Sequence, residues 1–391
     1  MNSCWPQFEE DEKDAVQSVL KSGKVNYWTG QGVQKFESEF AAYTGTQYAI
    51  AVSNGTVALE LALMACDIQP GDEVIVPART FLASASAVVM RGAKPVVCDI
   101  DLSSQCLTVD TVKPWITQNT KAIICVHLAG WPCDMDAIMV FAKERGLWVI
   151  EDCAQAHGAL YKGKSVGSLG HMGAFSFCQD KIMTTGGEGG MVTTNDSELW
   201  QKMWSFKDHG KDYDTVFNTQ HPSGFRWLHK EFGSNYRMTE MQSAIGRCQL
   251  KKLDQWNKRR TENAQVLIDV LSELDFIRIP RPDENEIRHA NYKFYAFFVP
   301  EKAPVGLTRD GLVECITKAG ITCMQGTCFN ITYEDCFKIY PDQYQKELPF
   351  AKQLGETSVM LLLDHTINYE CKEVISLLGG KLSARTLLGA L

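Results

Sequence analysis

The chain reads GAFSFCQDKIMTTGGEGG over residues 173–190. Its apolar start, residues 174–178, is typical of a buried strand, and Lys181 and a glycine cluster follow. Burial can shift a lysine amine toward its neutral, nucleophilic form, and glycines let the backbone come close to a ligand. The stretch therefore indicates a reactive lysine in a ligand pocket, although a solvated lysine before a hairpin has the same local pattern.

A second motif, EDCAQAHG at residues 151–158, favours the ligand pocket. It follows LWVI at residues 147–150, a continuous apolar run of the kind that central parallel strands show. Asp152 is thus expected at the carboxyl end of a strand, where open α/β sheets bind their ligands. Taken alone, this acid could equally cap a helix.

Together the two motifs resemble those of the DegT/DnrJ/EryC1/StrS family, the pyridoxal-phosphate-dependent sugar aminotransferases. The resemblance extends from about residue 25 to about residue 370, and several separately spaced motifs agree in order. It implies the aspartate-aminotransferase-like fold (fold type I), in which a large, mainly parallel α/β domain precedes a smaller α+β domain.

Length and periodicity are consistent with that architecture. A chain of 391 residues is longer than a single hydrophobic core usually accommodates, so we expect two domains, residues 1–250 and 251–391. Apolar runs alternate with helical patterns in the first of them, which predicts a mainly parallel sheet. The predicted strands are 48–52, 73–78, 95–100, 121–127 and 147–151.

Composition excludes several other classes of protein. The net charge is −8 and no block of lysine and arginine occurs, so neither nucleic acid nor a membrane is an expected partner. The amino terminus does not read as a signal peptide, which predicts a cytoplasmic protein with reduced thiols. Cys153 and His157 are four residues apart without a second ligand pair, so we expect no metal site.

One match to a nucleotide-binding motif is rejected on context. Residues 158–165 read GALYKGKS, which fits the P-loop pattern. A P-loop needs a strand directly before it and a helix directly after it, whereas glycines at 167, 170 and 173 would break such a helix. We expect a hairpin here, with Gly163 in its turn.

The segment SNGT at residues 53–56 predicts an anion site. It joins a predicted strand to a helix at 57–65, and backbone N–H groups at a helix amino terminus attract anions. An ordinary helix cap by Ser53 or Asn54 would look the same. The resemblance favours the anion, because it implies that Gly55 and Thr56 hold the cofactor phosphate; Ser176 also fits that role.

The resemblance also implies roles toward the cofactor ring. Lys181 would bond covalently to the cofactor aldehyde and then act as general base and acid. Asp152 would keep the pyridine nitrogen protonated, and Gln155 would contact the ring hydroxyl. Phe81 would stack on the ring, although a plain core position is the alternative for this phenylalanine.

A long, mostly irregular connection at 207–237 carries several histidines, lysines and arginines. Such cations suit an anionic substrate, and a solvated polar loop is the alternative. The connection ends in GSNYRMTEMQ at 233–242, followed by a predicted helix to about residue 260. The resemblance implies that Asn235 reaches the cofactor phosphate of a neighbouring subunit, and hence a homodimer.

For substrates, the resemblance implies L-glutamate as donor and a keto or aldehyde sugar as acceptor in cell-surface polysaccharide biosynthesis, such as that of lipopolysaccharide. Lysine rather than histidine at 181 favours amino transfer over dehydration. Residues 127–134 and 176–191 look more like the branch that aminates 3,8-dideoxy-8-oxo-manno-octulosonate to 8-amino-3,8-dideoxy-manno-octulosonate. A nucleotide-linked 4-keto-6-deoxy hexose, as in perosamine synthesis, is the alternative, and a non-catalytic cofactor-binding regulator is a more distant one.

Overall fold

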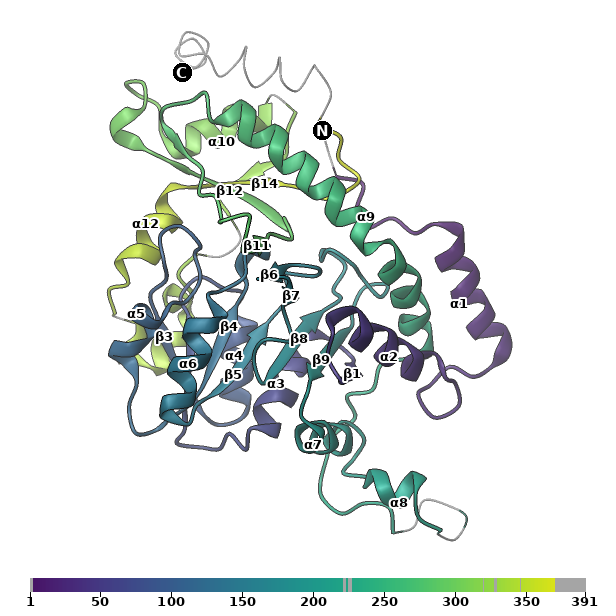
Figure 1. Cartoon of the computed structure of the whole chain (residues 1–391). Coiled ribbons are helices and arrows are strands. Elements are labelled where there is room, and N and C mark those ends of the chain that lie inside the picture. The colour runs from purple at the N-terminus through teal and green to yellow at the C-terminus, as the bar shows by residue number, and fades with distance from the viewer. Residues whose placement is uncertain are drawn as a thin grey trace.

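The structure is a computed structural model that describes residues 3–220, 223, 227–318, 320–326, 329–344 and 346–369. A seven-stranded sheet forms the larger part, and a four-stranded sheet lies above it in Figure 1. The sequence pattern also predicts a helix at 370–378, which lies outside the described residues. Among the helices of the described ranges, none has the length and apolar character needed to cross a bilayer.

The seven-stranded sheet has the strand order β1-β9-β8-β5-β4-β2-β3. Its members are β1 (Tyr48–Val52), β2 (Glu73–Pro77), β3 (Lys94–Cys98), β4 (Thr120–Val126), β5 (Trp148–Asp152), β8 (Met172–Ser176) and β9 (Gly190–Thr194). Only β9 runs antiparallel to its neighbours in this sheet, β8 and β1. The prediction of a mainly parallel α/β sheet is confirmed.

Both faces of the sheet are buried, as β1 illustrates. Ile50 and Val52 belong to one hydrophobic cluster, which includes helix α3 (Gly55–Ala65). Ala49 and Ala51 belong to a second cluster, which includes helix α2 (Gly32–Thr44). Successive side chains of a strand point to opposite faces, so this division shows helices covering both sides of the sheet.

The remaining helices of this part are α1 (Glu10–Ser22), α4 (Ala83–Met90), α5 (Val109–Val112), α6 (Met135–Arg145), α7 (Ser197–Lys207) and α8 (Tyr213–Phe217). Helices α4 and α7 both pack against α3. Helix α1 ends at Gly23, whose φ of 68° lies in the left-handed region that favours glycine.

Helix α9 (Glu240–Leu271) connects the two main sheets and is longer than the sequence predicted. The four-stranded sheet is antiparallel, in the order β10-β12-β14-β13. Its strands are β10 (Ile277–Arg278), β12 (Lys293–Phe298), β13 (Cys323–Met324) and β14 (Ser358–Leu362), accompanied by α10 (Arg309–Lys318), α11 (Pro341–Tyr344) and α12 (Pro349–Thr357). The expected domain boundary at 250/251 falls within α9, and the domain limits stay a prediction.

Residues 158–165 form the hairpin that the sequence predicted in place of a P-loop. Strands β6 (Leu160–Tyr161) and β7 (Lys164–Ser165) pair antiparallel, and Gly163 in the turn has a φ of 78°. Strand β11 (Ile287–Arg288) pairs with β6, so the hairpin joins the carboxyl-terminal part to the first part.

Glu151 on β5 is fully buried and satisfied by hydrogen bonds. Three backbone N–H groups of the turn 167–170 donate to its carboxylate at 2.7–2.9 Å, and His127 Nε2 lies 2.9 Å from it. The backbone N–H of Cys133 donates to His127 Nδ1, so Nε2 carries the proton. An ionised carboxylate can remain in the core because these donors replace water. Glu151 therefore holds the turn that leads into β8.

We expect the substitution Glu151→Ala to lower the free energy of unfolding by several kcal/mol, because each buried donor left without a partner costs about 1–3 kcal/mol. Urea unfolding followed by circular dichroism measures the loss. The matched control is Glu144→Ala, whose side chain is 65% exposed beside Arg145 and should change stability by less than about 0.5 kcal/mol. Equal stability of the two variants would contradict the structural role of Glu151.

Candidate active site

A cavity of about 640 Å³ lies at the carboxyl ends of β5 and β8, bordered by the start of α3. All but one of the residues predicted for the cofactor line it: Gly55, Thr56, Phe81, Asp152, Gln155, Ser176 and Lys181. These residues come from four separate segments of the chain. The fold thus places them around one space, and their individual roles stay predictions.

Asp152 is a buried acid at the wall of this cavity. Ser84 Oγ donates to its Oδ2 at 2.9 Å, and the Ala154 N–H donates to its Oδ1 at 3.1 Å. Burial raises the pKa of the Asp152 carboxyl, whereas these two hydrogen bonds and the charge of Lys181 act in the opposite direction. A cationic ring nitrogen in the cavity would stabilise the carboxylate further.

Lys181 extends its amine into the same cavity, with 17% of its side chain exposed. Its Nζ lies 3.5 Å from the Tyr292 hydroxyl and 3.5 Å from Asp180 Oδ1. The Tyr292 hydroxyl donates to Asp180 Oδ2 at 2.6 Å. Burial tends to raise the pKa of Asp180, but the charge of Lys181 and the Tyr292 hydrogen bond hold this pKa below its ordinary value. The amine is thus held at the cavity wall by partners that the sequence did not reveal.

The amino terminus of α3 forms another wall of the cavity. Gly55 and Thr56 begin the helix there, and Asn54 caps it by accepting from the Val57 N–H at 3.0 Å. The predicted cap is therefore present, and the anion site at the same helix start stays a prediction. A methyl group on Gly55 would lie 2.5 Å from Ser176 Cβ, so only glycine allows this close approach. Helix dipole, backbone N–H groups and the Ser176 hydroxyl suit a phosphate.

Gln155 and Phe81 complete the predicted set. Gln155 Oε1 accepts from the Ala129 N–H at 2.9 Å, which fixes the buried side chain at the cavity wall. Phe81 is 66% exposed and lines the cavity, so it is not a core residue. An exposed aromatic ring at a pocket is available for stacking on a planar ligand.

A model of the DegT/DnrJ/EryC1/StrS aminotransferase family matches residues 6–378. The chain belongs to this family. GDP-perosamine synthase from Escherichia coli O157:H7 is 45% identical over 261 residues, which cover 67% of this chain and 68% of that protein. The dTDP-3-amino-3,6-dideoxy-alpha-D-galactopyranose transaminase of Aneurinibacillus thermoaerophilus is 41% identical over 276 residues, 70% of this chain and 71% of that protein.

Among solved structures, an aminotransferase from Psychrobacter cryohalolentis superimposes with a TM-score of 0.94 and 50% identity, covering 97% of this chain and 98% of that one. The protein is therefore an aminotransferase of fold type I, and its cofactor is pyridoxal 5'-phosphate. The cavity suits this group, because a buried acid, a lysine amine and a helix amino terminus border one space.

Asn235 is the one predicted cofactor residue that does not line the cavity. It is exposed and forms an isolated β-bridge with Asp208. Its expected contact with a neighbouring subunit stays a prediction.

The expectation that the 207–237 connection offers many cations to a substrate needs correction. Lys207 Nζ is buried 3.3 Å from Glu37, and Lys211 Nζ lies 3.1 Å from Asp208. Lys230 Nζ lies 2.8 Å from Asp212. These amines neutralise nearby acids. His221 and Arg226 lie outside the described residues.

His157, whose spacing from Cys153 was weighed above as a metal-ligand pattern, packs near two aromatic rings. Its ring centroid is 5.7 Å from that of Phe175 and 5.6 Å from that of Phe177. Burial lowers the pKa of His157 to about 3. The imidazole is therefore neutral and packs as an aromatic side chain.

Three residues near the chemistry were missed by the sequence reading: Ser84, Asp180 and Tyr292. Ser84 lies three positions after Phe81, near the start of α4. An expectation that this helix begins at the ligand pocket would have made Ser84 a candidate. Asp180 directly precedes Lys181, but nothing in the local sequence indicated that its carboxylate would lie near the amine. Tyr292 is 111 residues from Lys181, and no local signal marks it.

We expect Gly55→Ala to weaken binding of pyridoxal 5'-phosphate, because the added methyl group must displace Ser176 from the predicted phosphate site. Absorbance titration of the cofactor-free protein measures the dissociation constant. Gly311→Ala in α10 is the control, since its new methyl group does not border the cavity and would meet Thr308 Oγ1 at 3.3 Å, a tight contact that a shift of a few tenths of an ångström in this side chain relieves. Unchanged cofactor affinity in Gly55→Ala would place the phosphate elsewhere.

Proposed function

We propose that this aminotransferase moves the amino group of L-glutamate to a keto sugar linked to a nucleotide. The observation that carries the proposal is that Lys181 and Asp152 border one cavity. Two relatives reported above are named for products that are nucleotide-linked amino sugars, which favours that class of acceptor. The octulosonate predicted from residues 127–134 and 176–191 stays a prediction, because neither relative is named for it.

Four residues at the cavity would take part in amino transfer: Lys181, Asp152, Tyr292 and Asp180. Bound pyridoxal 5'-phosphate supplies an aldehyde and an electron-accepting ring. Lys181 Nζ would hold the aldehyde and would move a proton at the donor's α-carbon. Asp152 holds a proton at the ring nitrogen. Tyr292 and Asp180 keep Nζ at the wall of the cavity between these events.

The cellular setting and assembly belong to the same proposal. The amino sugar would enter a cell-surface polysaccharide, lipopolysaccharide being the predicted case, and the reaction would take place in the cytoplasm. A homodimer would bring Asn235 of one subunit to the cofactor phosphate of the other, which agrees with the exposed position of this side chain.

The proposal is tested by offering the holoenzyme glutamate first and acceptors second. Glutamate alone should abolish the absorbance band of the lysine-bound cofactor and release 2-oxoglutarate. Mass spectrometry should then find an amino sugar after addition of a GDP- or dTDP-linked keto-6-deoxy hexose. Lys181→Ala should fail both steps. Amination of the octulosonate alone would favour the earlier prediction, and no response to glutamate would support a non-catalytic regulator.

We expect Asp152→Asn to lose most activity while remaining folded. Removing one member of a buried ion pair costs about 3–5 kcal/mol, equivalent to roughly a hundred- to several-thousand-fold in rate. Steady-state kinetics give the loss, and circular dichroism checks the fold. Asp67→Asn, whose carboxylate is 69% exposed, is the matched control and should keep full activity. An active Asp152→Asn enzyme would contradict the role assigned to this acid.

A further inference from the structure

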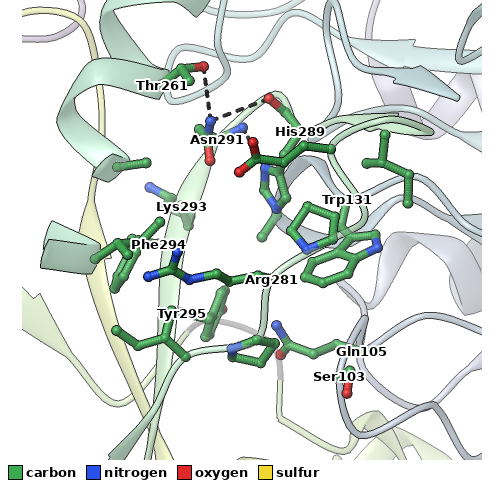
Figure 2. A pocket seen from close by; sticks show the side chains of 18 of the residues that line it. Ser103, Gln105, Trp131, Thr261, Arg281, His289, Asn291, Lys293, Phe294 and Tyr295 are labelled. Atoms are coloured by element: carbon green, nitrogen blue, oxygen red, sulfur yellow. Dashed lines mark hydrogen bonds between the residues drawn. The ribbon is translucent and has the colours of Figure 1, made fainter. Parts of the chain in front are cut away.

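Three cavities meet at the start of β12. Tyr292, just before the strand, lines the catalytic cavity and a small cavity of about 210 Å³. Lys293 lines this small cavity and a larger one, of about 450 Å³, that lies between the two main sheets. Figure 2 shows the larger cavity, with Trp131 and Arg281 among its lining side chains. The wall of the small cavity includes part of the amino-terminal segment, residues 3–6.

Trp5 of this segment packs its ring into a small aromatic cluster. The ring meets those of Trp256 and His365 edge to face, at centroid distances of 5.3 and 4.8 Å. Trp256 and His365 stack on each other at 4.3 Å, with an interplanar angle of 8°. The Cys4 N–H also donates to Thr366 Oγ1 at 3.0 Å. These partners lie on α9 and in the turn after β14, so the amino-terminal segment is held from the side of the four-stranded sheet.

The Trp5 indole links this cluster to the backbone of Lys181. Its Nε1–H donates to the Lys181 carbonyl oxygen at 2.9 Å, a contact between residues 176 positions apart. The Lys181 N–H donates to the Cys178 carbonyl oxygen at 3.0 Å. Both polar groups of the Lys181 backbone are therefore hydrogen-bonded. Because the allowed side-chain directions depend on the backbone dihedrals, these two bonds help to set the direction in which the amine extends into the catalytic cavity.

Regular secondary structure does not hold Lys181 in place. Residues 177–189, all of which the structure describes, lie between β8 and β9 and form neither a helix nor a strand. The segment depends instead on single contacts, such as the bond from the Thr184 N–H to Gln249 Oε1 of α9 at 2.8 Å. The small cavity also leaves space beside this segment that packing does not fill. The bond from Trp5 therefore supplies a restraint that secondary structure does not.

The chemistry proposed for Lys181 depends on the position of its amine. A side chain that moves a proton must come within about 2.6–3.2 Å of the atom that carries it. A displacement of about 1 Å, even when its cause lies far from the reacting atoms, can lower a rate about a hundredfold. The Tyr292 hydroxyl and Asp180 hold the amine end of the side chain, and Trp5 holds the backbone end. Lys181 is thus restrained at both ends by groups outside its own peptide.

We propose that Trp5 is a positioning residue of this aminotransferase, whose indole N–H holds the Lys181 carbonyl so that Nζ stays directed into the catalytic cavity. The inference rests on the role given to Lys181 in the proposed function. Trp5 does not line the catalytic cavity, so it acts through the Lys181 peptide and not on the substrate. The alternative is that the Trp5 ring only packs the amino-terminal segment against α9. The N–H group matters in the first case, and the ring matters in the second.

The test compares the unchanged holoenzyme with Trp5→Phe, which keeps an aromatic ring and removes the N–H donor. Stopped-flow absorbance follows the loss of the lysine-bound cofactor band over a series of glutamate concentrations. We expect the rate at saturating glutamate to fall on the order of tenfold because one hydrogen bond is lost, while the half-saturating concentration changes by less than about twofold. Trp148→Phe is the matched control and should keep the full rate, since Trp148 begins β5 and its ring packs 4.9 Å from that of His171.

A second variant, Trp5→Ala, separates the hydrogen bond from the packing because it removes both. We expect it to be at least as slow as Trp5→Phe. A slow Trp5→Phe enzyme that melts within about 2 °C of the unchanged enzyme supports the inference, since its fold is then intact. A normal rate in Trp5→Phe overturns the inference, and if Trp5→Ala is slow in that case, the ring is what matters. No response of the unchanged enzyme to glutamate would instead overturn the proposed function, on which the inference rests.

Discussion

Two adjacent acids on β5, Glu151 and Asp152, are both buried, but their surroundings differ. The side chains of Glu151 and Asp152 point to opposite faces because a strand alternates. Glu151 receives hydrogen bonds from the turn 167–170 and from His127, so its charge is satisfied within the protein. Asp152 faces a cavity instead, where burial raises its pKa. The same strand therefore carries one carboxylate with a structural role, Glu151, and one that a cationic ligand in the cavity would stabilise, Asp152.

The glycine-rich stretch after β8 serves the same cavity by allowing segments to approach closely. A methyl group on Gly190 would lie 2.4 Å from the Asn54 carbonyl oxygen, and one on Gly55 would meet Ser176. Because both positions are glycine, β9 and β8 can lie against the start of α3. The helix amino terminus and Ser176 then reach one side of the cavity, while Lys181 reaches the other. Close backbone approach is thus the condition for bringing these groups together.

The cavity between the two main sheets has a different character from the catalytic one. Its charged groups come from β11, β12 and the loop before β11, and Trp131 and Gln105 come from segments that follow β4 and β3. No single segment contains a recognisable motif for it. Trp131 lies within a stretch that the sequence reading used only to choose a family branch, and Arg281 lies in a loop to which no role was assigned. Such a cavity becomes visible only when the two sheets are placed against each other.

The sequence by itself predicted a mainly parallel large sheet and the hairpin at 158–165, and the family resemblance supplied most of the residues that border the catalytic cavity. The sheet and the hairpin follow from local patterns, namely apolar runs and glycines at tight turns. Only the tertiary structure decided that Tyr292 and Ser84 contact Lys181 and Asp152, that Lys207 and Lys211 neutralise buried acids, and that Arg281 and Trp131 line one cavity. The physical reason is that contacts between segments far apart in the chain depend on how the sheets and α9 pack, and residue spacing carries no information about that packing.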